Sequence, residues 1–325
     1  MTRFCQILLI FGTFQILSII LITSLKYYQE FGYSNENVKL PLRHTKFSRN
    51  FLKKKEWDFL LAANTTLSKE DAEFPSLQEL NFLKVYLEQN NVPISANETS
   101  KRKVLFLIPY RKRALNLLYF LYYMLTYLQD RGVYHKFLIV EQSGAKKFRR
   151  GNLFNAGVLL AEERFPDFDC FCLHDVDNLP LYNITRYDCV DSGISQLIDG
   201  VVSQGGGVIQ RFYPELLGGV TMVAKEAYVK ANGMSNSFSG WGGEDDNFRI
   251  RAELANITIT REYQSVFYTI DHPDDRVYDT SRFRKITKEY VNHTYQTDGL
   301  NSFKYELMIY EENDFFSRAV VILLN

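Results

Sequence analysis

The sequence lacks an excess of charge of either sign. Its 325 residues include 38 Lys and Arg and 38 Asp and Glu, which give a formal net charge of zero. A protein that reads nucleic acid needs a basic face, and the basic cluster at residues 43–55 lies outside the candidate folded domain. With 46% hydrophobic and 15% aromatic residues, the composition is that of a globular protein without electrostatic affinity for nucleic acid.

The sequence has no visible internal repeat or low-complexity segment, and cysteine is scarce. Of the four cysteines, Cys5 lies in an apolar N-terminal run, which leaves Cys170, Cys172 and Cys189. In an oxidising compartment two of these three are expected to form a disulfide.

A long apolar run is present at the N-terminus. Residues 5–25 are almost uninterruptedly apolar, about the length that a bilayer helix requires. A cleavable signal peptide has a shorter apolar core, so we expect an uncleaved signal-anchor. Arg3 favours a cytosolic tail over residues 1–4 and a lumenal location for the rest of the chain.

Asparagine sequons support the lumenal location. Five are present, at Asn64, Asn97, Asn183, Asn256 and Asn292. Residues 26–102 are polar and irregular, with a predicted helix over 77–89, and we interpret them as a lumenal stem.

The pattern changes at residue 103. Apolar strands are predicted over 104–108, 137–140 and 168–173, with helices over 114–128 and 152–164 between them. This alternation predicts an α/β domain over 103–325 with a mostly parallel sheet, whose strand ends form a nucleotide crevice. Residues 181–240 lose the alternation and contain several glycines, which could form lids, allow close backbone approach to a ligand, or make ordinary turns.

Two aspartates follow the strand that ends near residue 173. On an extended chain Asp175 and Asp177 would share a face, and their hard oxygen ligands suit Mg²⁺ or Mn²⁺. The alternative is a polar strand end in which Asn178 and Pro180 form a turn.

A second acidic motif occupies residues 238–247. An indole, Trp241, precedes two glycines and three consecutive acids, Glu244, Asp245 and Asp246. An aromatic ring for a sugar face, glycines for close approach and carboxylates for hydroxyl groups indicate a carbohydrate site with a general base. The alternative is an acidic start to a helix over 244–254.

These motifs and others in the same order resemble the β-1,4-galactosyltransferase family. The matching blocks are Ile-Pro-Tyr-Arg-Lys-Arg at 108–113, Phe-Arg-Arg at 148–150, Phe-Asn-Ala-Gly at 154–157, Asp-Val-Asp at 175–177, Gly-Gly at 218–219, Asn-Gly-Met-Ser-Asn at 232–236, Trp-Gly-Gly-Glu-Asp-Asp at 241–246 and Asp-Gly-Leu-Asn-Ser at 298–302. The resemblance implies a GT-A type domain in the Golgi lumen, anchored as a type II membrane protein. It also implies an inverting, Mn²⁺-dependent transfer of galactose or N-acetylgalactosamine from a UDP-sugar, in β-1,4 linkage, to a glycan acceptor such as terminal N-acetylglucosamine.

The resemblance assigns roles by position. Asp177 and His272 match metal ligands, Asp245 matches the catalytic base, and Glu244 supports it. The acceptor sugar would contact Asp245, Asp246 and Gly242. The nucleotide sugar would contact Pro109, Tyr110, Arg111, Arg113, Phe148, Arg150, Asp175, Val176, Leu216 and Trp241. The family disulfide would join Cys170 to Cys189 and leave Cys172 a buried thiol.

Three positions depart from the family pattern. Thr269 stands where relatives place Met or His, and threonine is a poor ligand for a borderline metal, so that Asp271 or water would have to substitute. Ser239 stands where relatives usually have Trp. Leu216 stands where galactose-preferring relatives have Tyr, which leaves room for the acetamido group of N-acetylgalactosamine.

Two rival functions remain at this stage. Thr269 and Ser239 would suit a non-catalytic sugar-binding relative of the family. Clustered acids would also suit a metal-dependent phosphohydrolase, although the nucleotide motifs disfavour it. The oligomeric state is not predicted.

Overall fold

A computed structural model describes residues 38–39, 72–92, 102–181, 184–203, 208–270 and 277–324. The predicted anchor at residues 5–25 and the metal ligand His272 lie outside these ranges. Among the described helices, none is both long and apolar enough to cross a bilayer.

Four described helices match those predicted over 77–89, 114–128, 152–164 and 244–254, whereas α7 (Lys225–Lys230) and α9 (Arg282–Asn292) were not predicted. The four are α4 (Leu77–Gln89), α5 (Ala114–Gln129), α6 (Arg150–Arg164) and α8 (Glu244–Leu254), and the described 3₁₀ turns are η1 (Thr294–Gln296) and η2 (Leu300–Ser302). The strands are β1 (Val38–Lys39), β2 (Lys103–Tyr110), β3 (Tyr134–Gln142), β4 (Cys170–His174), β5 (Asn178–Pro180), β6 (Ile194–Gln196), β7 (Gly200–Ser203), β8 (Val208–Arg211), β9 (Val220–Ala224), β10 (Ile259–Arg261), β11 (Val266–Thr269), β12 (Tyr305–Glu312) and β13 (Phe316–Leu323).

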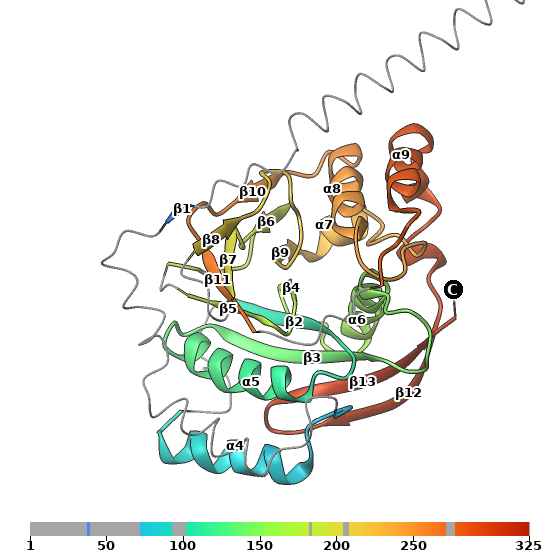
Figure 1. Ribbon diagram of the computed structural model, residues 1–325. Coiled ribbons are helices and arrows are strands. Elements are labelled where there is room, and N and C mark those ends of the chain that lie inside the picture. The colour runs from blue at the N-terminus through green and yellow to red at the C-terminus, as the bar shows by residue number, and fades with distance from the viewer. Residues whose placement is uncertain are drawn as a thin grey trace, which may run out of the picture. The chain divides into compact units, whose positions relative to one another are not determined.

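The larger sheet is mixed: four of its seven strand pairings are parallel, as predicted for most of the sheet, and three are antiparallel. Its order is β10-β6-β9-β4-β2-β3-β13-β12 (Figure 1). The central strands β4, β2, β3 and β13 pair in parallel, whereas β9 runs antiparallel to both β4 and β6, and β12 runs antiparallel to β13. The predicted alternation of strands and helices spans only β2 to β4. The antiparallel pairings involve strands from later segments, where strands and helices do not alternate in this way. A smaller sheet contains β8, β7, β11 and β5 in that order.

Each central strand sends alternate side chains to two separate cores. On β2, Phe106 and Ile108 pack in the hydrophobic core that contains Phe120 of α5. Leu105 and Leu107 pack in a second core on the other face of the sheet, which contains Phe154 of α6. The sheet is buried on both faces because its strands are apolar at successive positions. This arrangement leaves the carboxyl ends of the strands as the exposed edge on which polar residues can gather.

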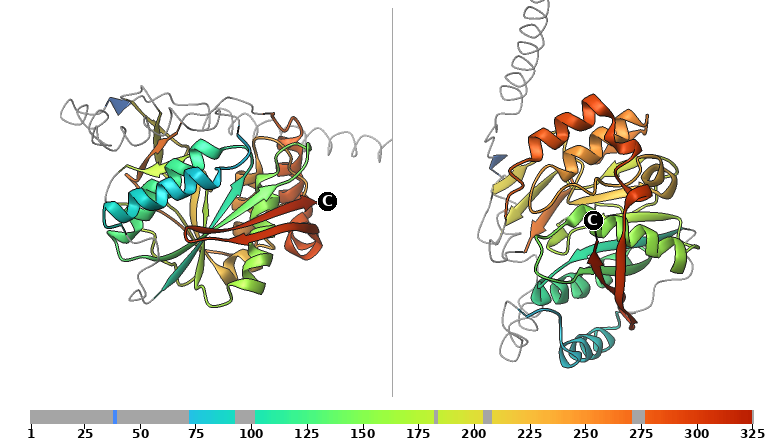
Figure 2. Two further views of the ribbon diagram at one scale, coloured as in Figure 1. Left: turned by 90° about the horizontal axis from the view of Figure 1, so that it is seen from below. Right: turned by 90° about the vertical axis from the view of Figure 1, so that its right-hand side faces the viewer.

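Helix α4 packs against α5 on the side away from the sheet (Figures 1 and 2). Leu80, Leu83 and Leu87 are buried in the same core as α5. Ser76 caps the helix: its hydroxyl accepts a hydrogen bond from Glu79 N at 3.3 Å, and its amide donates to Glu79 Oε2 at 2.5 Å. The helix lies in the range predicted to be stem, and the boundary at residue 103 stays a prediction.

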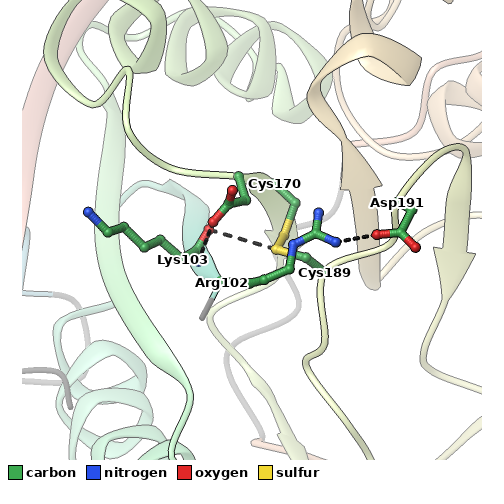
Figure 3. Close-up of a disulfide and its surroundings, with 6 residues drawn as sticks. Arg102, Lys103, Cys170, Cys189 and Asp191 are labelled. Atoms are coloured by element: carbon green, nitrogen blue, oxygen red, sulfur yellow. Dashed lines mark hydrogen bonds and ion pairs between the residues drawn. A yellow bond between two sulfur atoms is a disulfide. The ribbon is translucent and has the colours of Figure 1, made fainter. Parts of the chain in front are cut away.

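The predicted disulfide is confirmed. Cys170 on β4 is joined to Cys189, and Cys172 is a buried free thiol. Figure 3 shows the bridge beside Arg102 and Asp191, which form an ion pair near the surface. A bridge of this sequence separation stabilises a domain by about 3 kcal/mol in the chain-entropy account. It closes the loop that contains Asp175 and Asp177.

Candidate active site

The acids of the two motifs come together around one arginine. Arg150 begins α6, Asp175 follows β4, and Glu244 and Asp245 begin α8. Arg150 Nε lies 2.6 Å from Asp175 Oδ1. Arg150 Nη1 lies 2.6 Å from Asp245 Oδ1 and 3.7 Å from Glu244 Oε1. Residues far apart in the sequence therefore form one site where β4 ends.

Arg150 is the counter-charge of this acidic cluster. Its guanidinium carbon lies 4.8 Å from the centre of the Phe154 ring, which faces the cation one turn along α6. Burial disfavours the charge of Arg150, but the neighbouring carboxylates favour it more strongly, so its pKa lies well above the usual value. The cluster nevertheless holds more carboxylates than cations, which leaves it with excess negative charge.

Burial raises the pKa of each of the three carboxylic acids. The pKa of Asp245 rises to about 6 because burial and the nearby Asp175 outweigh the opposing effect of Arg150. The pKa of Glu244 rises to about 7, through burial first and repulsion by Asp245 second. For Asp175 burial again outweighs Arg150, and the pKa reaches about 6. Desolvation is the largest cause of each shift, and repulsion between the clustered acids adds to it.

Gly218 allows the carboxylate of Asp245 to approach the sheet. A Cβ atom at Gly218 would lie 2.2 Å from Asp245 Cγ and Oδ2. The backbone there cannot retreat easily, because Gly218 O accepts a hydrogen bond from Gln196 Nε2 at 2.7 Å. The neighbouring Gly219 O accepts a hydrogen bond from Asp175 N at 3.0 Å. Close approach is therefore the reason for glycine at residue 218.

The glycine turn before α8 requires left-handed backbone. Gly240, Gly242 and Gly243 have φ angles of 81°, 106° and 90°, and Gly243 is the N-cap of α8. Helix α8 begins at Glu244 as predicted, so its first turn holds the three acids at the positive end of the helix dipole. The prediction that this motif starts a helix is therefore confirmed, and an acidic helix start is compatible with a ligand-binding site.

Trp241 lies on the surface of this turn. Its side chain is 46% exposed and packs edge-on against Tyr278, with 5.1 Å between ring centres. Its amide donates to Val277 O at 2.7 Å, and its carbonyl accepts from Asp279 N at 3.0 Å. The indole is thus held by its backbone while one large aromatic surface stays accessible to a ligand.

Asp246 has a partner that the sequence did not reveal. Tyr213 donates its hydroxyl hydrogen to Asp246 Oδ1 at 2.8 Å. Burial raises the pKa of Asp246, and this hydrogen bond opposes the rise. Tyr213 lies in the irregular segment before the two glycines, where no periodicity or spacing singled it out.

Asp175 and Asp177 do not share the face of an extended strand, contrary to our prediction. They lie in the turn that carries the chain from β4 to β5, with Asn178 N donating to Asp175 O at 3.4 Å. The chain must turn here because β4 and β5 belong to different sheets. Ile270 N donates to Asp177 O at 2.8 Å, so the end of β11 lies beside Asp177.

Some of the residues near Asp177 carry oxygen atoms that suit a hard divalent cation. Thr269 donates its hydroxyl hydrogen to Asn178 Oδ1 at 3.1 Å. His272 and Asp271 follow β11 but lie outside the described residues. Within the described part of the chain, no three His, Cys, Asp or Glu residues are grouped to hold a metal ion. The excess negative charge of the site and the buried Glu244 Oε2, which has no hydrogen-bond partner, fit a bound cation chemically.

The predicted nucleotide contacts lie at the carboxyl ends of β2 and β3. Arg111 lies 5.2 Å from the centre of the Phe148 ring and donates to Lys146 O at 2.6 Å. Tyr110 is fully buried, and its hydroxyl donates to Glu73 O at 2.8 Å, so its side chain is already engaged within the protein. Arg113 N donates to the same hydroxyl at 3.1 Å.

Other predicted residues are located as follows. Pro109 is the penultimate residue of β2, and Val176 and Leu216 are buried. The sequons at Asn256 and Asn292 are exposed, whereas Asn64, Asn97 and Asn183 lie outside the described residues.

The sequence matches two family profiles. The N-terminal region of glycosyl transferase group 7 matches residues 53–190, and the N-terminal domain of galactosyltransferase matches residues 208–273. Beta-1,4-galactosyltransferase 4 of Mus musculus is 35% identical over 224 residues, which are 68% of this chain. The alignment spans 63% of the length of that relative, less than two thirds of it.

Solved structures of similar fold come from Drosophila. The catalytic domain of beta1,4-galactosyltransferase 7 in complex with xylobiose is 26% identical, with a TM-score of 0.58, and the match covers 68% of this chain and 94% of that one. A mutant of that enzyme in complex with manganese, UDP-Gal and xylobiose is 24% identical, with a TM-score of 0.55 and the same coverage. The mixed α/β architecture of the present chain is thus that of GT-A glycosyltransferases.

Proposed function

Because the chain belongs to the β-1,4-galactosyltransferase family of group 7 glycosyltransferases, we propose that it is an inverting, metal-dependent glycosyltransferase. It moves galactose or N-acetylgalactosamine from a UDP-sugar, in β-1,4 linkage, to a sugar acceptor such as terminal N-acetylglucosamine on a glycoprotein or glycolipid. The observation that carries the proposal is the contact of Arg150 with both Asp175 and Asp245, which joins the proposed donor side to the proposed base.

Asp245 acts as the general base. The acceptor hydroxyl oxygen forms a bond to the anomeric carbon while the bond from that carbon to the diphosphate oxygen breaks, and Asp245 takes the hydroxyl proton. A carboxylate with a pKa of about 6 is mostly ionised near neutral pH and is still basic enough to accept a proton. Glu244 supports Asp245 from the same first turn of α8. Asp246, Gly242 and Trp241 bind the sugars.

The donor binds along the exposed edge of the larger sheet. Arg111, Arg113 and Arg150 supply positive charge for the diphosphate, since guanidinium groups match its geometry. Phe148 supplies an aromatic face for uracil, on which Arg111 already packs. Pro109, Tyr110, Asp175 and Val176 complete the contacts.

A divalent cation is held by Asp177 and by His272 from the following segment. Such an ion, when bound, stabilises the negative charge of the leaving diphosphate. Thr269 is already hydrogen-bonded to Asn178, so it is a weak candidate for a third ligand. A Drosophila enzyme of the same fold was solved with manganese, which makes Mn²⁺ the first ion to test.

The donor sugar is proposed from Leu216. This side chain precedes the two glycines that approach Asp245 and Asp175. A leucine there offers no hydroxyl group to the 2-substituent of the sugar and leaves room for an acetamido group. UDP-N-acetylgalactosamine should therefore be used at least as well as UDP-galactose.

The chain is further proposed to be a type II protein of the Golgi membrane. Residues 1–4 form the cytosolic tail, residues 5–25 the anchor, residues 26–102 the lumenal stem and residues 103–325 the catalytic domain. The disulfide agrees with an oxidising lumen, and the exposed Asn256 and Asn292 are available for glycosylation.

A second candidate is a non-catalytic sugar-binding relative, which the engaged hydroxyl of Thr269 would favour. One experiment separates the two. The purified protein is incubated with Mn²⁺, UDP-galactose or UDP-N-acetylgalactosamine and an N-acetylglucosamine acceptor, and the product linkage is read by NMR. A β-1,4 disaccharide supports the transferase. Acceptor binding without product supports the binding protein, and release of free sugar without acceptor would indicate a hydrolase.

A further inference from the structure

A turn at residues 232–236 is held against α6 by buried hydrogen bonds. Asn155, fully buried on α6, donates from its amide nitrogen to Met234 O at 2.7 Å and to Asn236 Oδ1 at 3.1 Å. Its amide oxygen accepts from Met234 N at 2.9 Å and from Tyr228 at 2.8 Å. A Cβ at Gly233 would lie 2.4 Å from this oxygen, so the turn cannot be moved closer or replaced easily.

The opposite side of the same turn is held to α8. Arg251 of α8 is fully buried, and its guanidinium donates to Gly233 O at 3.2 Å. It also donates to Asn247 Oδ1 at 2.8 Å and to Glu289 Oε2 on α9 at 3.1 Å. Glu289 is fully buried as well, and it accepts further hydrogen bonds from Asn247, Thr294 and Tyr295. Helices α8 and α9 are therefore joined through a desolvated ion pair.

Asp298 joins the turn to the arginine of α8. Asp298 Oδ1 accepts from Asn236 N at 2.9 Å, and Oδ2 accepts from Ser235 Oγ at 2.5 Å. The second oxygen also accepts from Arg251 Nη2 at 3.3 Å. The carboxylate of Asp298 thus accepts hydrogen bonds both from the turn, which is bound to α6, and from Arg251 of α8.

These contacts form a closed ring with the candidate active site. Arg150 and Asn155 belong to α6, and Asp245 and Arg251 belong to α8. At one end of the two helices Arg150 and Asp245 lie 2.6 Å apart. Further along, the turn and Asp298 connect Asn155, five residues after Arg150 on α6, with Arg251 near the end of α8. Asp298 and the direct bond from Arg251 to Gly233 O are therefore the two links between the turn and α8.

A buried arginine and a buried carboxylate tolerate few alternative arrangements. Each buried charge is costly unless its partners keep good geometry, so a satisfied network permits one arrangement of its helices and penalises others. Apolar contacts between α8 and its neighbours would permit small slides, because they are not directional.

We propose that Asp298 is a positioning residue that sets the distance between Arg150 and Asp245. The inference rests on the proposed function, since Asp245 is the base only if the chain is a transferase. A displacement of about 1 Å at a reacting group can lower the rate by about 10²-fold.

The test compares Asp298→Asn with a matched control, Glu312→Gln, in the full-length protein. Glu312 also accepts three hydrogen bonds, from Lys136, Tyr310 and Ser317, but it lies on the β12–β13 hairpin. Asp298→Asn is expected to lower kcat by about 10- to 100-fold with the donor KM changed less than about threefold. Glu312→Gln should leave kcat within about twofold of the wild type, at a similar fall in Tm.

A double-mutant cycle separates positioning from general loss of structure. In the Asp245→Asn background the substitution Asp298→Asn should lower the residual rate by less than about threefold, because the base is already absent. Equal effects in both backgrounds, or a kcat for Asp298→Asn equal to that of Glu312→Gln, would overturn the proposal. If Asp298→Asn does not fold, Ser235→Ala removes one donor to the same carboxylate and should lower kcat without changing the donor KM; an unchanged kcat would likewise overturn it.

An inactive wild type would refute the proposed function and leave the positioning role to another measurement. Hydrogen exchange of the amides of residues 244–248 should be faster in Asp298→Asn and unchanged in Glu312→Gln. Unchanged exchange in both variants would overturn the positioning role independently of any activity.

Discussion

Replacement of Gly218 by alanine should displace the proposed base without unfolding the domain. The new Cβ would lie 2.2 Å from Asp245 Cγ and Oδ2, and Gly218 is fixed by the hydrogen bond from Gln196 to its carbonyl. Ordinary contact needs a separation of about 3.4 Å, so the carboxylate must move by about 1 Å. That movement lengthens the 2.6 Å contact between Arg150 and Asp245.

We expect Gly218→Ala to lower kcat by about 10²-fold, equivalent to about 2.7 kcal/mol of barrier height. The donor KM should change little, because the contact of Arg150 with Asp175 is unaffected. Arg150 lowers the pKa of Asp245, so a weaker contact should raise that pKa above about 6 and move the acid limb of the kcat profile to higher pH.

Steady-state kinetics over pH and thermal unfolding measure these effects. Gly157→Ala is the matched control: its Cβ would lie 3.2 Å from Leu107 and Val140 in the core, away from the acids, and kcat should stay within about twofold of the wild type. A Gly218→Ala protein with a normal kcat and an unshifted acid limb would refute the placement of Asp245 as the base.

Four further predictions concern single residues. Asp177→Ala should abolish Mn²⁺-dependent transfer with little change in Tm, and near-normal transfer would contradict the metal assignment. Asp245→Asn should lower turnover by about 10² or more while UDP-sugar binding, measured by calorimetry, persists; parallel loss of donor affinity would indicate a structural role. Leu216→Tyr should shift donor preference toward galactose by about 10- to 200-fold, and an unmodified protein that already prefers galactose strongly, with no shift, would contradict the donor proposal. The pKa of His174 is lowered from 6.5 to about 4 by burial, so the folded state keeps it neutral, hydrogen-bonded to Tyr187, while the unfolded chain is protonated below pH 6.5. Protonation of His174 in the unfolded chain should therefore lower the free energy of unfolding by up to about 3 kcal/mol as the pH drops from 6.5 to 4, while the raised pKa values of Asp175, Glu244 and Asp245 act in the opposite direction. Urea titrations should show the His174 contribution as a difference in pH slope between the wild type and His174→Gln, and equal slopes would contradict it.

Local structure was predictable where the sequence carried a strong period or a strong cap. The helix over 77–89 begins after the capping residue Ser76, and the helix over 244–254 begins after Gly243, both at the predicted residues. The predicted helix over 114–128 ends one residue later, at Gln129. These elements depend on contacts within a few residues, which the order of side chains determines directly.

Contacts between distant segments were less predictable. The sequence could not show that β9 inserts antiparallel between β4 and β6, nor that Asp175 and Asp177 lie in a turn between two sheets. It also could not pair Tyr213 with Asp246 or join Arg251 to Asp298, because no local pattern reports a contact across tens of residues. Motif resemblance brought the acids together in one site, but their partners required the fold.

The packing of α4 limits where the chain could be cut to release the part that we propose to be lumenal. Leu80, Leu83 and Leu87 are buried in one core with residues of α5, and the ring of Tyr86 lies 5.5 Å from that of Tyr122. Proteolysis between residues 93 and 101 would strip α4 away and leave an apolar face of α5 in contact with water, a surface prone to self-association. Cleavage before residue 72 would remove the preceding part of the proposed stem and keep this cover, so a released form that stays in solution should begin upstream of α4.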